Sequence, residues 1–538
     1  MASWFCRVFP FLCKSDPPQP PSPPPPTPDI LGCTDAWSIT YNPLATKDNG
    51  TCSYPDIWMI PGDATERAAY FFQDFHGFNC ARAFNKKFKN KDGKYWFQDD
   101  NIIRGIVAAG VTVLRNGGTV VMGQRFSTST GNAYQDSIGQ WPVCFSEDRR
   151  NELVTPPDLS EFISMGELQQ DRSEDVNFFH LYKAALESTF CKAVLVINPY
   201  QPVQEVSDLI AFIGPDNIAQ LVLGNELNSP KAYRLGIRAE DVMFWADAIK
   251  PIADANNLPL VVGVPPYEWK YRENTGQPLN SKLLADKDFV LKLADYQVET
   301  NNFDGIAFHP YRQVPDRDPL ETTEQYLHRL EDGWNYNDGE ILGAQIALID
   351  QLFPGTILCP DEHGIEHPEY GHMGSPLSLF HYAIRMMELA IRHNVSSSCY
   401  QLLMAEPTQE GGPQSFVYLD PLTGEFRLSP EFGVFAMLSD VASIDNVLDV
   451  MVSTDKPGVA DEAEAYAFSN RFGQNIVVFV NLGSTAITTN IVSAGESAVL
   501  QPDINVFAVT EQSPADVKGL AVPPQSITVF TNATFKQP

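Results

Sequence analysis

Residues 221–228 read LVLGNELN, and residues 357–364 read ILCPDEHG. Each stretch is a short apolar run that ends abruptly in polar residues, and each has a glutamate among them, Glu226 in one and Glu362 in the other. Strands buried on both faces of a parallel sheet have this pattern, because polar residues begin only where the strand leaves the sheet. The two stretches therefore predict two parallel strands, each followed by a glutamate.

The same pattern recurs along the central part of the chain. A first strand is expected within 68–78, and further apolar runs lie at 111–114, 193–197, 221–223, 260–264, 306–308, 357–359 and 400–404. Between them, residues 240–252 and 375–391 carry apolar side chains at helical spacing. Eight strands alternating with helices predict an α/β fold, a (β/α)8 TIM barrel over residues 66–440. A doubly wound sheet is the alternative, but it usually carries a glycine-rich phosphate loop, and no such motif is present.

The N-terminal part of the chain has a different texture. Residues 17–28 contain nine prolines, which favour polyproline II and predict a semi-rigid spacer within an N-terminal segment, 1–31. Residues 32–55 then form a small module with little core of its own, in which Cys33 and Cys52 are expected to pair in a disulfide.

After about residue 441 the pattern changes again. Short apolar runs lie at 465–468, 476–480, 487–491, 498–500, 506–509 and 527–530, with turn residues between them and no helical stretch. This texture predicts an antiparallel β-sandwich over residues 441–538.

Composition narrows the possible partners. The 538 residues carry 67 Asp and Glu against 37 Lys and Arg, which gives a formal net charge of −30. Such an acidic surface disfavours nucleic acid and anionic membranes as partners. No apolar run approaches the length of about 18 residues that a membrane-spanning helix needs. Neutral or weakly charged partners fit this chain best.

The N-terminus and the glycosylation sequons bear on localisation. The apolar stretch within residues 1–13 is short and is interrupted by Pro10, so it is no regular secretory signal. The proline-rich spacer and the cysteine module nevertheless favour an extracellular or cell-surface protein that attaches to a wall or surface. Sequons at Asn49, Asn394 and Asn532 would permit glycosylation.

No metal or cofactor is expected in the barrel. The chain contains no Cys-x-x-Cys pair, and no further ligand stands at metal-binding spacing from His309. In the small module, the side-chain oxygens of Asp35, Asn42, Asp48 and Asn49 would suit calcium, and a purely turn-forming role for these residues is equally open. Cys191 and Cys359 lie in apolar surroundings, where a buried free thiol is the ordinary state.

The carboxyl ends of the strands are where a barrel places its chemistry. Polar residues follow the expected strands there: Arg115 after the second, Asn198 after the third, Asn225 and Glu226 after the fourth, His309 and Tyr311 after the sixth, and Glu362 after the seventh. Two carboxylates across a cleft suit cleavage of a glycosidic bond, since one protonates the leaving group and the other meets the developing oxocarbenium ion. An arginine can keep a carboxylate ionised, and a tyrosine can donate to it.

This set resembles the clan A retaining glycoside hydrolases. Asn225-Glu226 matches the Asn-Glu pair of that clan at strand four, Glu362 its Glu-aromatic-Gly pattern at strand seven, and residues 309–311 its His-x-Tyr after strand six. Residues 114–118, LRNGG, are similar to a Leu-Arg-x-Pro-Gly-Gly segment of the arabinofuranosidase and heparanase-like branches, with Asn where Pro often stands nearby. Those branches also append a β-sandwich, so the resemblance covers residues 66–538.

The resemblance implies a retaining O-glycosidase that acts on a polysaccharide or oligosaccharide by double displacement. It implies Glu226 as acid/base and Glu362 as nucleophile, with substrate contacts from the other rim residues, Arg115, Asn198, Asn225, His309 and Tyr311. A transglycosylase is open as well, because it differs only in what intercepts the intermediate. The alternative in another class is a non-catalytic carbohydrate-binding or wall-structural protein on an inactive barrel, which the presence of both glutamates disfavours.

The chain departs from the clan at several positions. Members often place a tryptophan after strand eight, whereas residues 400–406 read YQLLMAE. Trp269, in the loop after strand five, is the candidate sugar platform, and a packing role for it is equally open. The long insertion 119–175 is expected to shape the substrate cleft. Asp361 is expected to be a structural or rim group.

Overall fold

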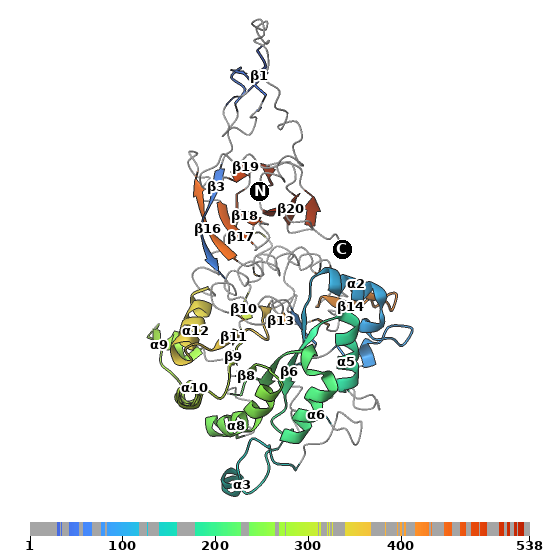
Figure 1. The fold of residues 1–538 in the computed structure, drawn as a ribbon, viewed down its shortest axis with the longest axis vertical. Coiled ribbons are helices and arrows are strands. Elements are labelled where there is room, and N and C mark those ends of the chain that lie inside the picture. The colour runs from blue at the N-terminus through green and yellow to red at the C-terminus, as the bar shows by residue number, and fades with distance from the viewer. Residues whose placement is uncertain are drawn as a thin grey trace, which may run out of the picture.

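The computed structural model contains an eight-stranded parallel sheet with helices around it, a second large β-sheet and a small N-terminal element (Figure 1). It describes residues 29–32, 34, 42, 44–52, 57–66, 77–80, 83–84, 86–117, 126, 139–158, 178–227, 236–263, 268–274, 276–309, 311–313, 320, 322, 325, 339–366, 382, 395, 399–400, 403–404, 415–429, 432, 446–453, 463–469, 475–483, 485–491, 505–509, 514–516, 521–523 and 526–531.

Eight parallel strands form the barrel. Their order in the sheet is β11 (Ile357–Cys359), β9 (Gly305–Ala307), β8 (Leu260–Gly263), β7 (Ile218–Leu223), β6 (Lys192–Ile197), β5 (Val113–Arg115), β4 (Gly77–Asn79) and β13 (Cys399–Tyr400). Bridges from Leu358 to Val395 and from His363 to Tyr400 join the two ends of this order, so the sheet closes on itself. The (β/α)8 barrel predicted from the sequence is confirmed. Its first strand, β4, lies at the far end of the predicted window.

Alternate residues of each strand face opposite sides of this sheet. In β6, Val194 and Val196 belong to a small apolar cluster with other compact side chains, whereas Leu195 and Ile197 belong to the large cluster that includes the helices. The small cluster fills the barrel, because a closed eight-stranded sheet leaves room only for such side chains. Cys359 lies in it as a buried free thiol, and Cys191 is also buried and free, as expected.

Helices pack around the outside of the barrel (Figure 1). Those described are α2 (Asp100–Ala108), α3 (Glu147–Leu153), α5 (Phe178–Thr189), α6 (Val203–Ile213), α8 (Ala239–Ala255), α9 (Glu268–Asn274), α10 (Ser281–Thr300) and α12 (Gly339–Leu352). Helix α8 confirms the pattern at 240–252, since Val242, Trp245 and Ile249 are all buried. The helix expected over 375–391 lies outside the described residues apart from Tyr382.

Short elements complete the described barrel and the N-terminal module. Single 3-10 turns lie at η3 (Lys86–Phe88), η4 (Trp96–Gln98) and η6 (Pro215–Asn217). Two-stranded pairs are formed by β1 (Leu31–Gly32) with β2 (Lys47–Asp48), β10 (Tyr311–Gln313) with β12 (Gly364–Glu366), and β14 (Val417–Leu419) with β15 (Phe426–Leu428).

A nine-stranded sheet contains the C-terminal strands. Its order is β21 (Pro514–Asp516), β20 (Asn505–Val509), β23 (Ser526–Thr531), β18 (Asn475–Asn481), β17 (Ala463–Ser469), β16 (Asn446–Ser453), β3 (Ile57–Glu66), β19 (Ile487–Ile491) and β22 (Ala521–Val522). Five of the six predicted runs are strands here, and the sixth, 498–500, lies outside the described residues. A two-layer sandwich stays a prediction.

Strand β3 is the unexpected member of this sheet. It precedes the barrel in sequence, yet it pairs antiparallel with β16 and parallel with β19. The predicted domain boundaries leave residues 56–65 in no domain. The chain therefore crosses the C-terminal sheet once before it forms the barrel.

Two further expectations, the disulfide and glycosylation, are not tested by the described residues. Cys33 lies outside them, as do the sequons at Asn394 and Asn532, so the pairing of Cys33 with Cys52 and glycosylation stay predictions. Within the described part of the chain, every helix is too short or too polar to cross a membrane.

Candidate active site

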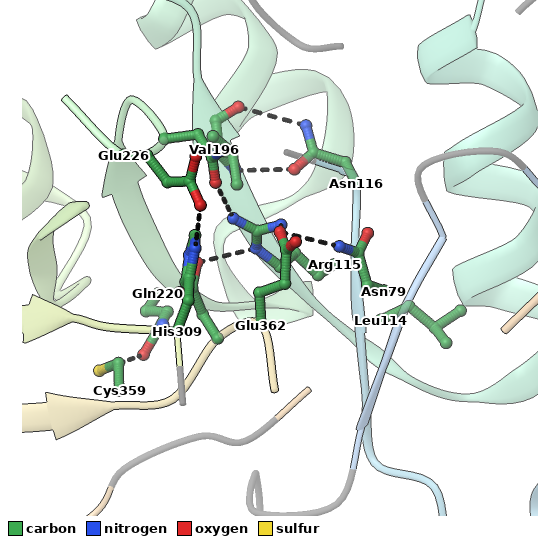
Figure 2. Close-up of polar contacts among 12 residues, drawn as sticks. Asn79, Leu114, Arg115, Asn116, Val196, Gln220, Glu226, His309, Cys359 and Glu362 are labelled. Carbon is green, nitrogen blue, oxygen red and sulfur yellow. Dashed lines mark hydrogen bonds and ion pairs between the residues drawn. The ribbon is translucent and has the colours of Figure 1, made fainter. Parts of the chain in front are cut away.

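Arg115 is the centre of a polar cluster at the carboxyl ends of the barrel strands (Figure 2). Its side chain is fully buried, and it donates through Nε to Asp361 Oδ2 at 2.8 Å, through Nη1 to Glu362 Oε2 at 2.8 Å and through Nη2 to Asn225 Oδ1 at 2.6 Å. The guanidinium thus joins the ends of β5, β7 and β11. Its fixed planar fork is suited to hold several acceptors in one arrangement.

Asn116 fixes the backbone beside this arginine. Its Oδ1 accepts a hydrogen bond from Val196 N at 2.7 Å, and its Nδ2 donates to Val196 O at 3.2 Å (Figure 2). The amide therefore continues the pairing of β5 with β6 by one step after β5 has ended. This contact keeps Arg115 pointed into the barrel mouth.

Glu226 follows β7 in a turn with an unusual backbone. Gly224 has a φ of 65° and Glu226 a φ of 48°. Such left-handed backbone costs a residue with a side chain on the order of 1 kcal/mol, and it is found where surrounding contacts enforce it. Here Gly224 N donates to Ile197 O and Leu227 N donates to Gly263 O, so the turn is tied to β6 and β8. The turn thus places Glu226 directly after β7, at the barrel mouth.

His309 lies between Glu226 and Asp361. Its Nδ1 is 3.0 Å from Glu226 Oε1, and its Nε2 is 3.3 Å from Asp361 Oδ1. Burial alone lowers the pKa of His309, but the negative charges of Glu362, Asp361 and Glu226 outweigh it and raise that pKa to about 10. The side chain of Glu226 is 31% exposed, so its carboxyl group is open to a ligand.

Glu362 follows β11 and is held by two donors. Besides Arg115, Asn79 donates through Nδ2 to Glu362 Oε2 at 3.2 Å (Figure 2). Two hydrogen bonds to the same oxygen fix the orientation of this carboxyl group. Its side chain keeps 13% exposure at the barrel mouth. Asn79 is absent from the sequence predictions, because the first strand could not be located closely enough to show which residue follows it.

Asp361 is fully buried beneath this cluster. Burial opposes its ionisation, but Arg115 and His309 outweigh that effect and hold the pKa of its carboxyl below the ordinary value. Of the two alternatives expected for Asp361, a structural or a rim group, the structural one fits, since Asp361 lies under the rim and contacts two of the predicted site residues.

The chain was compared with protein families, curated sequences and solved structures. Neither a protein-family profile nor a curated protein sequence matches the chain. Solved structures do match: AbfB, a family 51 alpha-L-arabinofuranosidase from Bifidobacterium longum, is 14% identical with a TM-score of 0.57 over 89% of this chain and 100% of that one. A GH51 arabinofuranosidase from Xanthomonas axonopodis pv. citri is 14% identical with a TM-score of 0.55, covering 89% and 99%.

A third match is to another family. A Paenibacillus polymyxa xyloglucanase from GH family 44 is 12% identical with a TM-score of 0.51, covering 88% of this chain and 99% of that one. The chain has the fold of clan A glycoside hydrolases. In this clan A fold, β7 and β11 are the fourth and seventh barrel strands, and Glu226 and Glu362 follow them.

Two other predicted site residues, Asn198 and Tyr311, have less direct evidence for a place in the site. Asn198 is buried, and its Oδ1 accepts from Tyr200 N at 2.8 Å, which shapes the loop after β6. Tyr311 pairs through its backbone with Gly364, two residues beyond Glu362, but its side chain lies outside the described residues. Both roles in substrate binding stay predictions.

Trp269 is not brought to the cluster by any contact among the described residues. It is 3% exposed within the large apolar cluster, and Lys287 Nζ lies 5.4 Å from its ring centroid. That burial is typical of a packing residue. In the described part of the chain, no group of three or more acidic, histidine or cysteine side chains is arranged to hold a metal ion.

Proposed function

We propose that this protein is a retaining O-glycoside hydrolase that cleaves a polysaccharide or oligosaccharide by double displacement. The observation that carries the proposal is the buried Arg115 fork, which holds Glu362 directly and holds Asn225 beside Glu226. One guanidinium thereby links the residues that follow the fourth and seventh strands of a clan A barrel. Two carboxyl groups in that relation suit the two steps of glycoside hydrolysis.

In the first step, Glu362 attacks the anomeric carbon and forms a glycosyl ester, while Glu226 gives its proton to the departing oxygen. Arg115 and Asn79 hold the Glu362 carboxyl group in one orientation. In the second step, Glu226 takes a proton from water as the water attacks the same carbon, and Glu362 is released as a carboxylate. Asn225 is positioned to bind a sugar hydroxyl next to the acid.

The test is covalent labelling. The protein is first assayed on a panel of aryl glycosides that includes arabinofuranosides, xylosides, galactosides and glucuronides, and then on soluble xyloglucan. The 2-deoxy-2-fluoro analogue of the sugar that is turned over should add its mass to the protein at the peptide that contains Glu362. Glu362→Gln should abolish both the label and turnover.

A matched control is Glu425→Gln. Glu425 lies in the hairpin of β14 and β15 and pairs with Lys91, so its loss should leave labelling and turnover unchanged. A label on another residue would remove Glu362 from its role. Binding of a polysaccharide without turnover of any panel member would instead identify a non-catalytic carbohydrate-binding protein.

A further inference from the structure

His309 is held between two carboxylates that approach its two ring nitrogens. Glu226 Oε1 lies 3.0 Å from Nδ1, and Asp361 Oδ1 lies 3.3 Å from Nε2. The imidazole is 3% exposed and the Asp361 side chain is fully buried, so water has little access to the contact between them. A neutral imidazole can donate from only one nitrogen, whereas an imidazolium can donate from both.

The contact between His309 Nε2 and Asp361 Oδ1, at 3.3 Å, lies outside regular hydrogen-bond geometry, and it is an ion pair when His309 is protonated. Neither atom has a hydrogen-bond partner elsewhere among the described residues. With a neutral imidazole accepting at Nε2, two acceptors would face each other in a buried place, which is costly. With a proton on Nε2, the same contact becomes attractive, because Asp361 Oδ1 then accepts from that nitrogen. Nδ1 faces a second carboxylate oxygen, Glu226 Oε1, so a proton on each ring nitrogen provides a donor for both carboxylates. The geometry therefore favours an imidazolium.

We propose that Asp361 is a positioning residue that keeps His309 doubly protonated, as a permanent cation beside Glu226. Arg115 occupies the other oxygen of Asp361, so that carboxylate is itself fixed in place. The charged groups around the ring are Glu226 after β7, Asp361 and Glu362 after β11, and Arg115 at the end of β5.

The charge of this cluster explains what a permanent cation achieves, and this step rests on the proposed function. Arg115 and His309 are positive, and Asp361 and Glu362 are negative, so the cluster is neutral when Glu226 carries its acid proton. In the glycosyl ester, Glu362 has lost its charge and Glu226 has become a carboxylate, so the cluster is neutral again. A buried site changes least in electrostatic energy between two states of equal charge.

The experiment measures the ionisation of His309 in the full chain without substrate. Histidine labelled with ¹³C at Cε1 gives one signal for each of the nine histidines, and His309→Gln identifies the signal of interest by its loss. We expect the wild-type His309 signal to stay in its imidazolium position up to at least about pH 8. A midpoint near the ordinary value of about 6.5 would overturn the proposal.

Asp361→Asn tests the role of the carboxylate. Because Arg115 Nε needs an acceptor, the new amide should turn its oxygen to Arg115 and its NH2 group to His309. His309 must then accept at Nε2, and its imidazole must be neutral. The His309 midpoint should fall by at least about two units. Asp241→Asn is the control, since Asp241 is a buried partner of Arg149 elsewhere in the fold, and it should leave the midpoint unchanged.

A pH–rate profile separates positioning from mere loss of structure. The imidazolium stabilises the carboxylate of Glu226, so its loss raises the pKa of Glu226 and should move the basic limb of kcat/KM to higher pH in Asp361→Asn. If kcat/KM of Asp361→Asn is lower at every pH and its basic limb does not move, Asp361 does not act through His309. If no glycoside is hydrolysed at all, the proposed function fails, while the titration still decides the state of His309.

Discussion

At the scale of single residues, Glu226 and Glu362 are alike in type and differ in surroundings. Glu362 accepts hydrogen bonds from Arg115 and Asn79, whereas Glu226 Oε1 lies 3.0 Å from His309 Nδ1. Different surroundings are what allow one carboxyl group to act as acid while the other acts as nucleophile.

Glu226→Ala should therefore depend on the leaving group. For substrates with poor leaving groups the rate should fall roughly 10²–10⁴-fold, because no group protonates the departing oxygen. Activated phenols need little protonation, so their glycosylation step should suffer less, and azide should give a glycosyl azide of retained configuration. The measurement is steady-state rates on matched phenyl glycosides, with product analysis by NMR. Equal losses on all leaving groups without azide rescue would contradict the role of Glu226.

The ionisation of His309 also predicts a pH dependence of stability. Burial lowers the pKa of His309, but neighbouring carboxylates raise it to about 10, above the value of about 6.5 in an unfolded chain. A raised pKa contributes stability that is complete below about pH 6.5 and is lost as the pH rises toward 10. The difference in Tm between wild type and His309→Gln should thus shrink between pH 6 and about 10.

Using a difference removes the effects of lysines and tyrosines, which titrate in the same range in both proteins. The effect of Asp361 on stability has the opposite dependence on pH. Its pKa is lower in the folded protein than in the unfolded chain. It therefore contributes stability above its unfolded pKa, and that contribution is lost as the pH falls through its folded pKa. A Tm difference that grows with rising pH would mean that His309 is neutral in the folded protein.

At the scale of elements, the sequence predicts the barrel strands well and the irregular ones poorly. The run at 193–197 is confirmed by β6, because a strand buried on both faces must be continuously apolar. Strand β3 reads IWMIPGDATE, and its Pro-Gly-Asp centre is a turn signal. In the structure this Pro-Gly-Asp segment lies at a β-bulge or similar irregularity, where the register with β16 shifts between Leu448 and Val450.

The site residues also divide into those that the sequence predicts and those that it does not. Glu226 and Glu362 are visible in the sequence because each follows a clear apolar run. Asn79 is not, since β4 reads Gly-Phe-Asn and offers no apolar run. The buried position of Asp361 depends on contacts with Arg115 and His309, which are far apart in the sequence.

The turn after β7 offers a test at this scale. Gly224 has a φ of 65°, and a Cβ there would lie 2.4 Å from Leu227 Cδ2. Gly224→Ala should therefore cost more than the strain of about 1–2 kcal/mol that a left-handed residue brings, and it should lower kcat by misplacing Glu226. Gly236→Ala is the matched control, with a φ of 71° and a nearest atom at 3.6 Å.

Thermal melts and rates of the two glycine variants give the comparison. We expect Gly236→Ala to lose some stability and keep its rate, and Gly224→Ala to lose both. If the two variants lose equal stability and neither loses rate, the close packing of this turn does not position Glu226.

At the scale of the whole molecule, β3 joins the segment before the barrel to the C-terminal strands. Seven register pairs connect β3 to β16, and three connect it to β19. Removal of β3 would leave both neighbours with unpaired edges, which favour aggregation. The catalytic unit that we propose therefore begins at β3, before the first barrel strand, and includes the C-terminal sheet.

Two shortened chains test this division. A chain that begins at Pro55 lacks the proline-rich spacer and the small cysteine module but keeps β3. Closing a loop of about twenty residues between Cys33 and Cys52 would stabilise that module by roughly 3 kcal/mol, and this stabilisation is local to it. We expect the chain from Pro55 to melt cooperatively and to keep its turnover of small aryl glycosides. Only its attachment to a wall, a surface or a long polymer should change.

A chain that begins at Arg67 lacks β3 as well. We expect it to lose cooperative unfolding and soluble yield, because β16 and β19 lose the strand between them. Circular dichroism melts and rates on a soluble aryl glycoside compare the two chains with the full-length protein. If the chain from Pro55 fails as the chain from Arg67 does, the small module belongs to the catalytic unit. If the chain from Arg67 melts and turns over normally, β3 is dispensable and the unit begins with the barrel itself.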